Sequence, residues 1–211
     1  MKVVAINGSP KSNGNTALGL AKVMDALEAE GIQTERIDIG GRAIHGCVAC
    51  GGCGKNKNRK CVLDDDGVNE WLEPIFTADG VLLGSPVYYA GVNGALKSML
   101  DRAFYVGAAN GGLLRHKVGA AIVAVRRAGS VAALEQLHKY FTISEMLMPS
   151  SNYWSMIYGM TPGEADQDVE GSQCLGLLGK NMAWLMRLIQ YGRNTIPAPA
   201  PVVKDRMNFI R

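Results

Sequence analysis

Four of the five cysteines of this chain fall within fifteen residues, in the pattern Cys-x2-Cys-x2-Cys-x7-Cys formed by Cys47, Cys50, Cys53 and Cys61. Thiolates bind soft metals, and four of them make up the ligand set of a [4Fe–4S] cluster. Neighbouring glycines allow the backbone to wrap tightly around one centre. We therefore expect the four cysteines to hold such a cluster.

Two other interpretations of the cysteine stretch stay open. A structural zinc site usually pairs two cysteines with a second, well-separated pair, so the overlapping triplet favours iron–sulfur over zinc. A glycine-rich loop with free thiols or a redox disulfide would instead shape a substrate entrance. Four basic residues lie in the same loop and would stabilise an anionic cluster, form a docking face for an acidic electron-transfer protein, or simply be solvated. They are Lys55, Lys57, Arg59 and Lys60.

A second candidate site lies at the N-terminus. Residues 2–7 are an apolar run, residues 8–16 are rich in Gly, Ser, Asn and Thr, and a helix-like pattern follows. Strand, polar loop and helix together build phosphate sites in α/β proteins, because loop amides and the positive end of the helix dipole face the anion. The loop lacks the glycine spacing of nucleoside-triphosphate and dinucleotide sites, which favours a mononucleotide such as FMN. An ordinary turn with Ser12 or Asn15 as the helix N-cap is the alternative.

Two further loops are expected at the same edge of the sheet. Residues 85–94 offer backbone amides, glycines and the rings of Tyr88 and Tyr89, against which a planar ring system packs. Residues 126–130 begin with Arg126 and Arg127, whose guanidinium groups suit an electron-rich ring edge or a nicotinamide phosphate. Ordinary packing and solvated charge are the alternatives for the two loops.

The pattern of strands and helices that positions these loops indicates an α/β fold. Apolar runs predict strands at residues 2–7, 33–39, 80–84, 117–125 and 153–158, with helices after the first loop and at residues 70–76, 94–105, 131–143 and 175–191. This alternation predicts a doubly wound, five-stranded parallel sheet of flavodoxin-like order 2-1-3-4-5, with helices on both faces. We expect a single FMN-binding domain over residues 1–195, with a cysteine-rich loop at about 45–66. The proline-rich residues 196–211 predict an extended arm over the same or a neighbouring subunit.

The composition of the chain argues against nucleic acid and membranes as binding partners. The chain has 211 residues, a hydrophobic fraction of 47% and a formal net charge of +3, which is too small to indicate a nucleic-acid partner. It begins directly with a strand and contains no apolar stretch long enough to span a bilayer, so we expect neither a secretion signal nor membrane association. A cytoplasmic location follows as the expectation, and the clustered cysteines agree with it.

Several short motifs in combination identify a family. The motifs are Gly8-Ser9-Pro10 with Gly14-Asn15-Thr16, Asp64-Asp65-Asp66, Ala78-Asp79-Gly80, Gly84-Ser85-Pro86-Val87-Tyr88, Leu96-Lys97 and Asp101-Arg102. Together they resemble the NAD(P)H-dependent FMN reductase family of the flavodoxin-like superfamily. The cysteine stretch resembles that of its iron–sulfur flavoprotein branch. The resemblance implies that the FMN phosphate and ribityl chain are held by Ser9, Lys11, Ser12, Asn13, Asn15 and Thr16. It implies that the flavin ring is lined by Pro86, Val87, Tyr88 and Tyr89. The third loop adds Arg126, Arg127 and Gly129 as candidate cofactor-binding residues.

The resemblance also implies a function. NAD(P)H would reduce FMN, and the electrons would pass to a quinone, a nitro or azo compound or a flavin, or through the cluster to a ferredoxin-like protein. We expect no catalytic side chain, because the flavin carries the chemistry. A flavodoxin-type carrier without productive nicotinamide binding is the alternative, although such carriers are usually acidic and this chain is slightly basic. Family membership predicts a homodimer or homotetramer.

Overall fold

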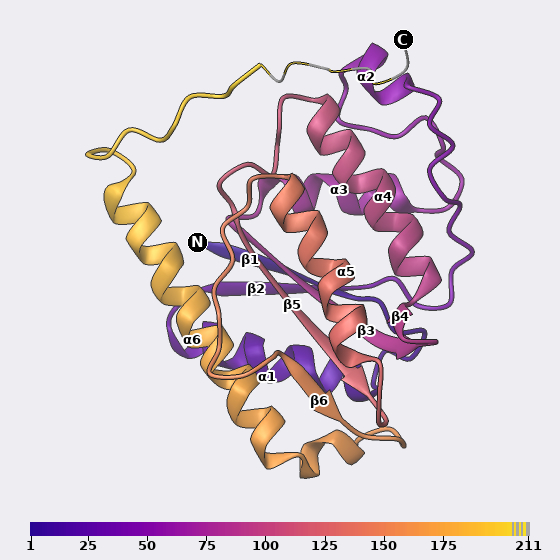
Figure 1. The fold of residues 1–211 in the computed structure, drawn as a ribbon, viewed down its shortest axis with the longest axis vertical. Helices are drawn as coiled ribbons and strands as arrows, with labels where there is room; N and C mark the ends of the chain where they lie inside the picture. The colour runs from indigo at the N-terminus through magenta and orange to yellow at the C-terminus, as the bar shows by residue number, and fades with distance from the viewer. Residues whose placement is uncertain (204, 206, 208, 210–211) are drawn as a thin grey trace.

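A parallel β-sheet forms the centre of the molecule (Figure 1). The computed structural model describes residues 1–203, 205, 207 and 209. Its five parallel strands lie in the order β2-β1-β3-β5-β6, which confirms the predicted flavodoxin-like order. The strands are β1 (Lys2–Asn7), β2 (Gln33–Asp38), β3 (Gly80–Tyr88), β5 (Val118–Val125) and β6 (Met156–Tyr158). A sixth, two-residue strand, β4 (Gly91–Val92), runs antiparallel to the end of β3.

Helices cover both faces of the sheet, as predicted. Helices α1 (Asn15–Ala29) and α6 (Val169–Gly192) pack on one face, against alternate residues of β1 such as Val3 and Ala5. Helices α3 (Val68–Thr77), α4 (Gly94–Ala109) and α5 (Ser130–Ile143) belong to the opposite core, with Val4 and Ile6. The central strands are buried on both sides because side chains alternate between two covered faces, which explains their continuous apolar sequence.

The register of the sheet brings the carboxyl ends of the strands to one edge. Asn7, the last residue of β1, pairs with Gly84, and Gly84 pairs with Ile122 of β5. The backbone amide of Gly8 donates to Gly84 O at 2.8 Å. A Cβ on Gly8 would lie 2.6 Å from Leu96 Cδ2, so only glycine lets the chain leave β1 this close to α4. This edge is where ligands bind in open α/β sheets.

Several elements differ from the predicted boundaries. Strand β3 continues four residues beyond the predicted end at Gly84, because Ser85 and Pro86 pair with β5 and the last two residues pair with β4 as a hairpin. Strand β6 begins at Met156 rather than at residue 153. Strand β4 was not predicted, nor were two short helices: α2 (Gly52–Asn56) in the cysteine-rich loop and the 3₁₀ helix η1 (Glu164–Gln167) before α6. Among the described helices, none is both long and apolar enough to cross a membrane.

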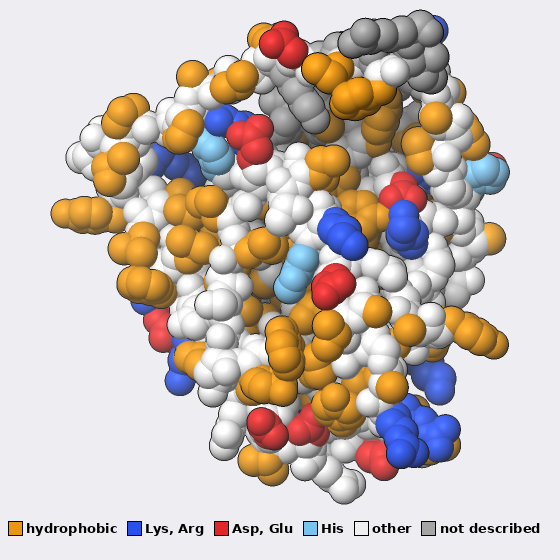
Figure 2. Space-filling view, viewed as in Figure 1, with side chains coloured by type: hydrophobic (Ala, Val, Ile, Leu, Met, Phe, Trp, Pro, Cys, Tyr) orange, Lys and Arg blue, Asp and Glu red, His pale blue; other side chains and the backbone are white. Residues whose placement is uncertain are grey.

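The proline-rich arm leaves α6 as an extended chain (Figure 1). Arg115 anchors it by donating from Nη2 to Pro199 O at 2.7 Å and to Ala200 O at 3.4 Å. The arm therefore contacts its own subunit first. Residues 204, 206, 208, 210 and 211 of the predicted arm lie outside the described residues. Exposed apolar side chains gather on the outer side of α6, at the left margin of Figure 2, and include Trp184, Leu188 and Tyr191.

Candidate functional site

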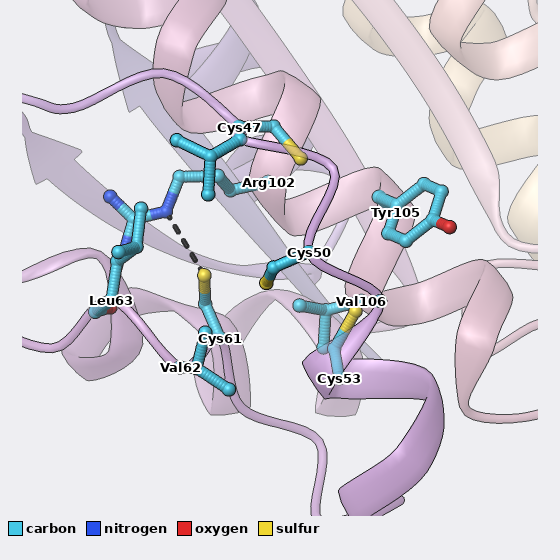
Figure 3. A pocket seen from close by; sticks show the side chains of 11 residues that line it. Cys47, Cys50, Cys53, Cys61, Val62, Leu63, Arg102, Tyr105 and Val106 are labelled. Carbon is cyan, nitrogen blue, oxygen red and sulfur yellow. Dashed lines mark hydrogen bonds between the residues drawn. The ribbon is translucent and has the colours of Figure 1, made fainter.

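All four clustered cysteines line a single pocket between the cysteine-rich loop and α4 (Figure 3). Cys53 lies on α2 and is buried, Cys61 is half-buried, and Cys47 and Cys50 are exposed. Left-handed backbone at Ala49, with φ of 53°, turns the chain between the first and second thiols, and Gly51, with φ of 70°, turns it between the second and the third. The four cysteines thus lie around one pocket, as their spacing in the sequence predicts.

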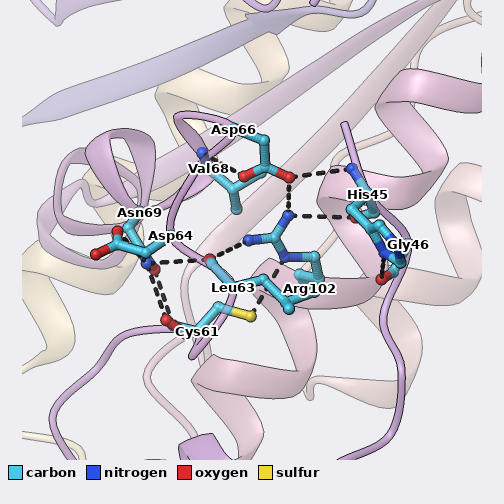
Figure 4. A network of polar contacts seen from close by, with 9 residues as sticks. All are labelled: His45, Gly46, Cys61, Leu63, Asp64, Asp66, Val68, Asn69 and Arg102. Carbon is cyan, nitrogen blue, oxygen red and sulfur yellow. Dashed lines mark hydrogen bonds and ion pairs between the residues drawn. The ribbon is translucent and has the colours of Figure 1, made fainter. Parts of the chain in front are cut away.

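Cys61 is fixed from two sides. Its backbone is held by Asn69 of α3, whose Oδ1 accepts from Cys61 N at 2.8 Å and whose Nδ2 donates to Cys61 O at 2.9 Å. Its sulfur accepts a hydrogen bond from Nε of Arg102 at 3.3 Å (Figures 3 and 4). Because α3 and α4 are both packed on the core, this thiol has a defined position although it lies in an irregular segment.

Arg102 is the central residue of a polar network on α4 (Figure 4). Its side chain is fully buried and pairs with the Asp66 carboxylate, of which only 5% of the side-chain area is exposed. Burial alone would raise the pKa of Asp66, but hydrogen bonds from Arg102 and from the His45 and Val68 amides hold that pKa below its usual value. Both groups are therefore charged at neutral pH. A buried ion pair without such hydrogen bonds would be costly.

The donor set of the pocket is four cysteine thiols, which is the ligand set of an iron–sulfur cluster. Among the described residues, no three His, Cys, Asp or Glu side chains lie close enough together to hold one metal ion. A [4Fe–4S] cluster takes one thiolate at each of four iron atoms, so its ligands surround a larger centre. Burial raises the pKa of the Cys53 thiol, so this cysteine needs a metal or another cation to favour its thiolate. The pocket residues thus fit a cluster.

The loop after β1 is shaped by two side chains inside it. Asn7 is buried, and its Oδ1 accepts from the Ser9 amide at 3.1 Å. Ser9 is also buried, and its Oγ accepts from the Lys11 amide at 3.1 Å. Lys11, Ser12 and Asn13 are exposed at the tip. The predicted phosphate loop is therefore a compact turn whose buried residues set its course.

Helix α1 begins in a way that suits an anion. Its N-cap is Gly14, not Ser12 or Asn15, and the first backbone bond is donated by Leu18 to Gly14 O at 3.1 Å. The amides of residues 15–17 precede that bond, and no side chain of the N-cap residue covers them. A terminal phosphate at this position would receive those N–H groups and the helix dipole. The geometry of the loop fits the FMN phosphate.

Asn15 has a different role from the one predicted. Its Oδ1 accepts from Gly163 N at 3.0 Å and Ala165 N at 3.3 Å, and its Nδ2 donates to Thr161 O at 2.9 Å. These bonds tie the segment before α6 to the start of α1. Thr16, also predicted to bind FMN, is buried beside it, with 2% of its area exposed. Asn15 therefore positions the phosphate loop through its side chain.

The second predicted loop is a tight hairpin. Tyr88 pairs with Gly91, and the two residues between them, Tyr89 and Ala90, have φ of 49° and 56°. Two consecutive left-handed residues define a type I′ turn, in which Asn and Gly are usual and Tyr is uncommon. The turn projects the Tyr89 side chain completely into solvent, while Pro86 and Val87 are half-buried beneath it. Of the predicted ring-lining residues, Tyr88 and Tyr89 are therefore exposed, whereas Pro86 and Val87 are half-buried below them.

The third loop contacts the second through Gly129. This glycine has φ of 90°, and a Cβ here would lie 2.7 Å from Ala90 Cα. Arg126 and Arg127 are exposed, and Figure 2 shows basic side chains gathered at this end of the molecule. Arg126 also borders a shallow groove with Tyr158 and Glu164. The fold therefore brings all three predicted loops to one edge of the sheet.

Residues 1–160 match the family described as NADPH-dependent FMN reductase. The chain belongs to the NADPH-dependent FMN reductase family. It is 36% identical over 197 residues to an iron–sulfur flavoprotein of Methanocaldococcus jannaschii, covering 90% of this chain and all of that protein. This confirms the resemblance drawn from the motifs.

Solved structures confirm the fold. The flavodoxin, WrbA-like protein from Agrobacterium tumefaciens superposes with a TM-score of 0.61 at 16% identity, covering 89% of this chain and 98% of that one. RosB, solved with 8-demethyl-8-formylriboflavin-5'-phosphate bound, superposes with a TM-score of 0.70 at 16% identity, covering all of this chain and 94% of that one. The flavodoxin-like fold of this FMN reductase family member is thereby established.

Sequence analysis missed several residues that shape the site in this family member. Asn7 and Asp38 end neighbouring strands, and a polar residue closing an apolar strand is the signal that could have found them. Asp66 was named only as one of three consecutive carboxylates, but it pairs with Arg102. Asn69 has no local signal, because its partners lie in a segment without regular structure.

Proposed function

We propose that this protein is an FMN-dependent oxidoreductase that takes electrons from NAD(P)H. The electrons pass to a small-molecule acceptor such as a quinone, a nitro or azo compound or a flavin, or through a [4Fe–4S] cluster to a ferredoxin-like protein. One observation carries the proposal: the four cysteine side chains line one pocket, in a chain that belongs to an FMN reductase family. The related iron–sulfur flavoprotein supports the same assignment.

The chain's own residues would hold FMN at the carboxyl edge of the sheet. The loop from Ser9 to Asn13 and the first amides of α1 would bind the phosphate, and Asn15 would hold the loop in shape. Pro86 to Tyr89 would support one face of the ring system. Bound FMN accepts two electrons as a hydride and can release them singly or in pairs, which is chemistry that the protein only orients.

The arginine loop supports the use of a nicotinamide donor. Arg126 and Arg127 follow β5 at the same edge and are exposed to an incoming ligand. Guanidinium groups bind phosphate in a bidentate manner, so they would position the phosphates of NAD(P)H near the ring. Hydride transfer then needs no acid or base from the protein.

The cysteine pocket would add one-electron transfer. Cys47, Cys50, Cys53 and Cys61 would ligate a [4Fe–4S] cluster, which exchanges single electrons. Two of the thiols are exposed, and basic side chains such as Lys55 and Lys60 are exposed in the same loop, so an acidic protein could approach closely. A reducing, cytoplasmic location and assembly as a homodimer or homotetramer complete the proposal.

The test begins with protein purified without oxygen. We expect flavin absorption bands over a broad brown absorption, with about four iron and four sulfide per chain. Cys53→Ala and Cys61→Ala should lose iron but keep FMN. Cys174→Ala is the matched control, because Cys174 is a buried cysteine of α6 outside the pocket. Equal iron content in all three variants would refute the ligand assignment.

The identity of the electron donor distinguishes an NAD(P)H-dependent oxidoreductase from a flavodoxin-type carrier. Rapid bleaching of the flavin by NADH or NADPH would support the oxidoreductase. Bleaching only by reduced ferredoxin would instead favour the flavodoxin-type carrier. Absence of flavin, even after FMN is added to the purified protein, would refute the FMN site altogether.

A further inference from the structure

We propose that Arg102 is a positioning residue for the iron–sulfur centre: its Nε–H hydrogen bond fixes the Cys61 sulfur as a ligand and raises the reduction potential of the cluster. The inference rests on the proposed function, since it assigns a role toward a cluster at the four cysteines. It starts from one uncommon contact, a buried guanidinium that donates to a thiol at 3.3 Å.

The guanidinium is held by partners that leave Nε for sulfur. Nη1 donates to His45 O at 3.2 Å and to the Asp66 carboxylate, and Nη2 donates to Leu63 O (Figure 4). The planar group therefore has a single orientation. The N–H on Nε is directed at the Cys61 sulfur.

The surrounding residues make this a directed contact rather than a general effect of charge. The Arg102 side chain is fully buried and the Asp66 side chain almost so, and the two opposite charges largely cancel at a distance. The electrostatic effect of Arg102 on the pocket therefore comes mainly from the dipole of its Nε–H group. Exposed cations of the same loop, such as Lys55, are screened by water.

The physical consequence concerns the reduced state of the cluster. Reduction adds one negative charge, and hydrogen bonds to the sulfurs stabilise that charge and raise the potential. A hydrogen bond inside the protein is stronger than one in water because the local dielectric constant is low. Removing the Arg102 contact should therefore make the cluster harder to reduce.

The experiment compares anaerobically purified wild type with Arg102→Lys. Lysine keeps the positive charge but cannot make the four contacts of the guanidinium fork. We expect the midpoint potential, followed by electron paramagnetic resonance during a redox titration, to fall by about 59 mV, which is a tenfold change for a one-electron couple. Lys55→Gln removes an exposed cation of the same loop, and its midpoint potential should match that of wild type.

A second measurement detects the proton of the hydrogen bond itself, first in the wild type and then in the variant. After exchange into D2O, electron–nuclear double resonance of the reduced cluster should detect an exchangeable proton coupled to it, and this coupling should be missing from Arg102→Lys. Loss of iron from Arg102→Lys with FMN and circular dichroism unchanged would also support the positioning role.

The outcomes distinguish the two proposals. Four irons in wild type, with equal midpoint potentials and equal proton couplings in Arg102→Lys, would overturn the role of Arg102 and leave the proposed function intact. Wild-type protein without iron would overturn both the cluster and the role of Arg102.

Discussion

Asn7 Nδ2 lies 2.7 Å from Asp38 Oδ1, and this contact joins the ends of β1 and β2 where the sheet opens toward its polar edge. The same Asn7 side chain accepts from the amide of Ser9, a buried residue of the phosphate loop. A contact between two strands therefore sets the direction in which the loop departs. This relationship makes the FMN site sensitive to a residue that need not touch the cofactor.

Replacing Asn7 by Ala should weaken FMN binding and stability together. The substitution leaves the Ser9 amide without its acceptor, which costs about 1–3 kcal/mol for a buried group. We expect about a tenfold rise in the Kd of FMN, measured by fluorescence quenching of the flavin on addition of apoprotein. Gln33→Ala, an exposed change on β2, is the control. An unchanged Kd in Asn7→Ala would show that the loop keeps its course without this contact.

Asn15→Ala should release the segment before α6. Three hydrogen bonds join this side chain to residues 161, 163 and 165, and their loss should cost about 1–3 kcal/mol of unfolding free energy. Hydrogen exchange followed by mass spectrometry should show faster exchange over residues 159–167. Asn194→Ala, an exposed asparagine after α6, should leave that exchange unchanged.

Gly129→Ala should disturb the contact between the second and third loops. A Cβ at this position would lie 2.7 Å from Ala90 Cα in a backbone conformation that alanine avoids, so we expect a loss of more than about 1 kcal/mol. The hairpin tip should shift, and FMN affinity should fall. Gly176→Ala is the matched control: it lies in α6 with open space around it and should stabilise the protein by about 0.4–1 kcal/mol. Equal thermal stability of both variants would contradict the steric argument.

The raised pKa of the Tyr140 phenol should make the protein less stable at alkaline pH. Burial, with a hydrogen bond to the Asp101 carboxylate, raises the pKa of Tyr140 from 10.0 to about 12. Between these values the unfolded chain loses the phenolic proton and the folded protein keeps it, so unfolding becomes easier as pH rises. The full effect is about 2 kcal/mol, present below pH 10 and lost by about pH 12. Urea unfolding of Tyr140→Phe should lack this component, whereas Tyr191→Phe, which alters an exposed ring, should keep it.

The strands and their order were predictable because apolar runs and alternating helices leave few right-handed arrangements. The cysteine pocket was predictable too, since its spacing is local. Helix α2 was not, because its sequence GCGKN has low helix propensity and its place depends on partners such as Asn110, whose Nδ2 donates to Cys53 O at 3.5 Å. The extension of β3 to Tyr88 depends on pairing with β5 and then with β4, which no local pattern shows.

The roles of individual polar side chains were the least predictable part of the site. Asn15 suited a phosphate ligand by position, but its amide bonds a segment almost 150 residues away. Asp66 looked like one of three similar carboxylates until the fold placed Arg102 beside it. Such assignments depend on long-range contacts, whereas the FMN reductase motifs depend on neighbours in the chain.

The cysteine-rich segment has little regular structure of its own, since α2 is its only helix among the described residues 40–67. Arg102 contacts it at two places far apart in its sequence, at His45 and over the stretch from Cys61 to Asp66. One side chain thus closes the segment into a single cooperative unit. If the four cysteines hold the proposed cluster, its oxidative loss would leave that closure largely to Arg102 and Asn69. The segment should then open as a whole. Limited proteolysis should therefore cut the chain between α2 and α3 faster after the protein has been exposed to oxygen.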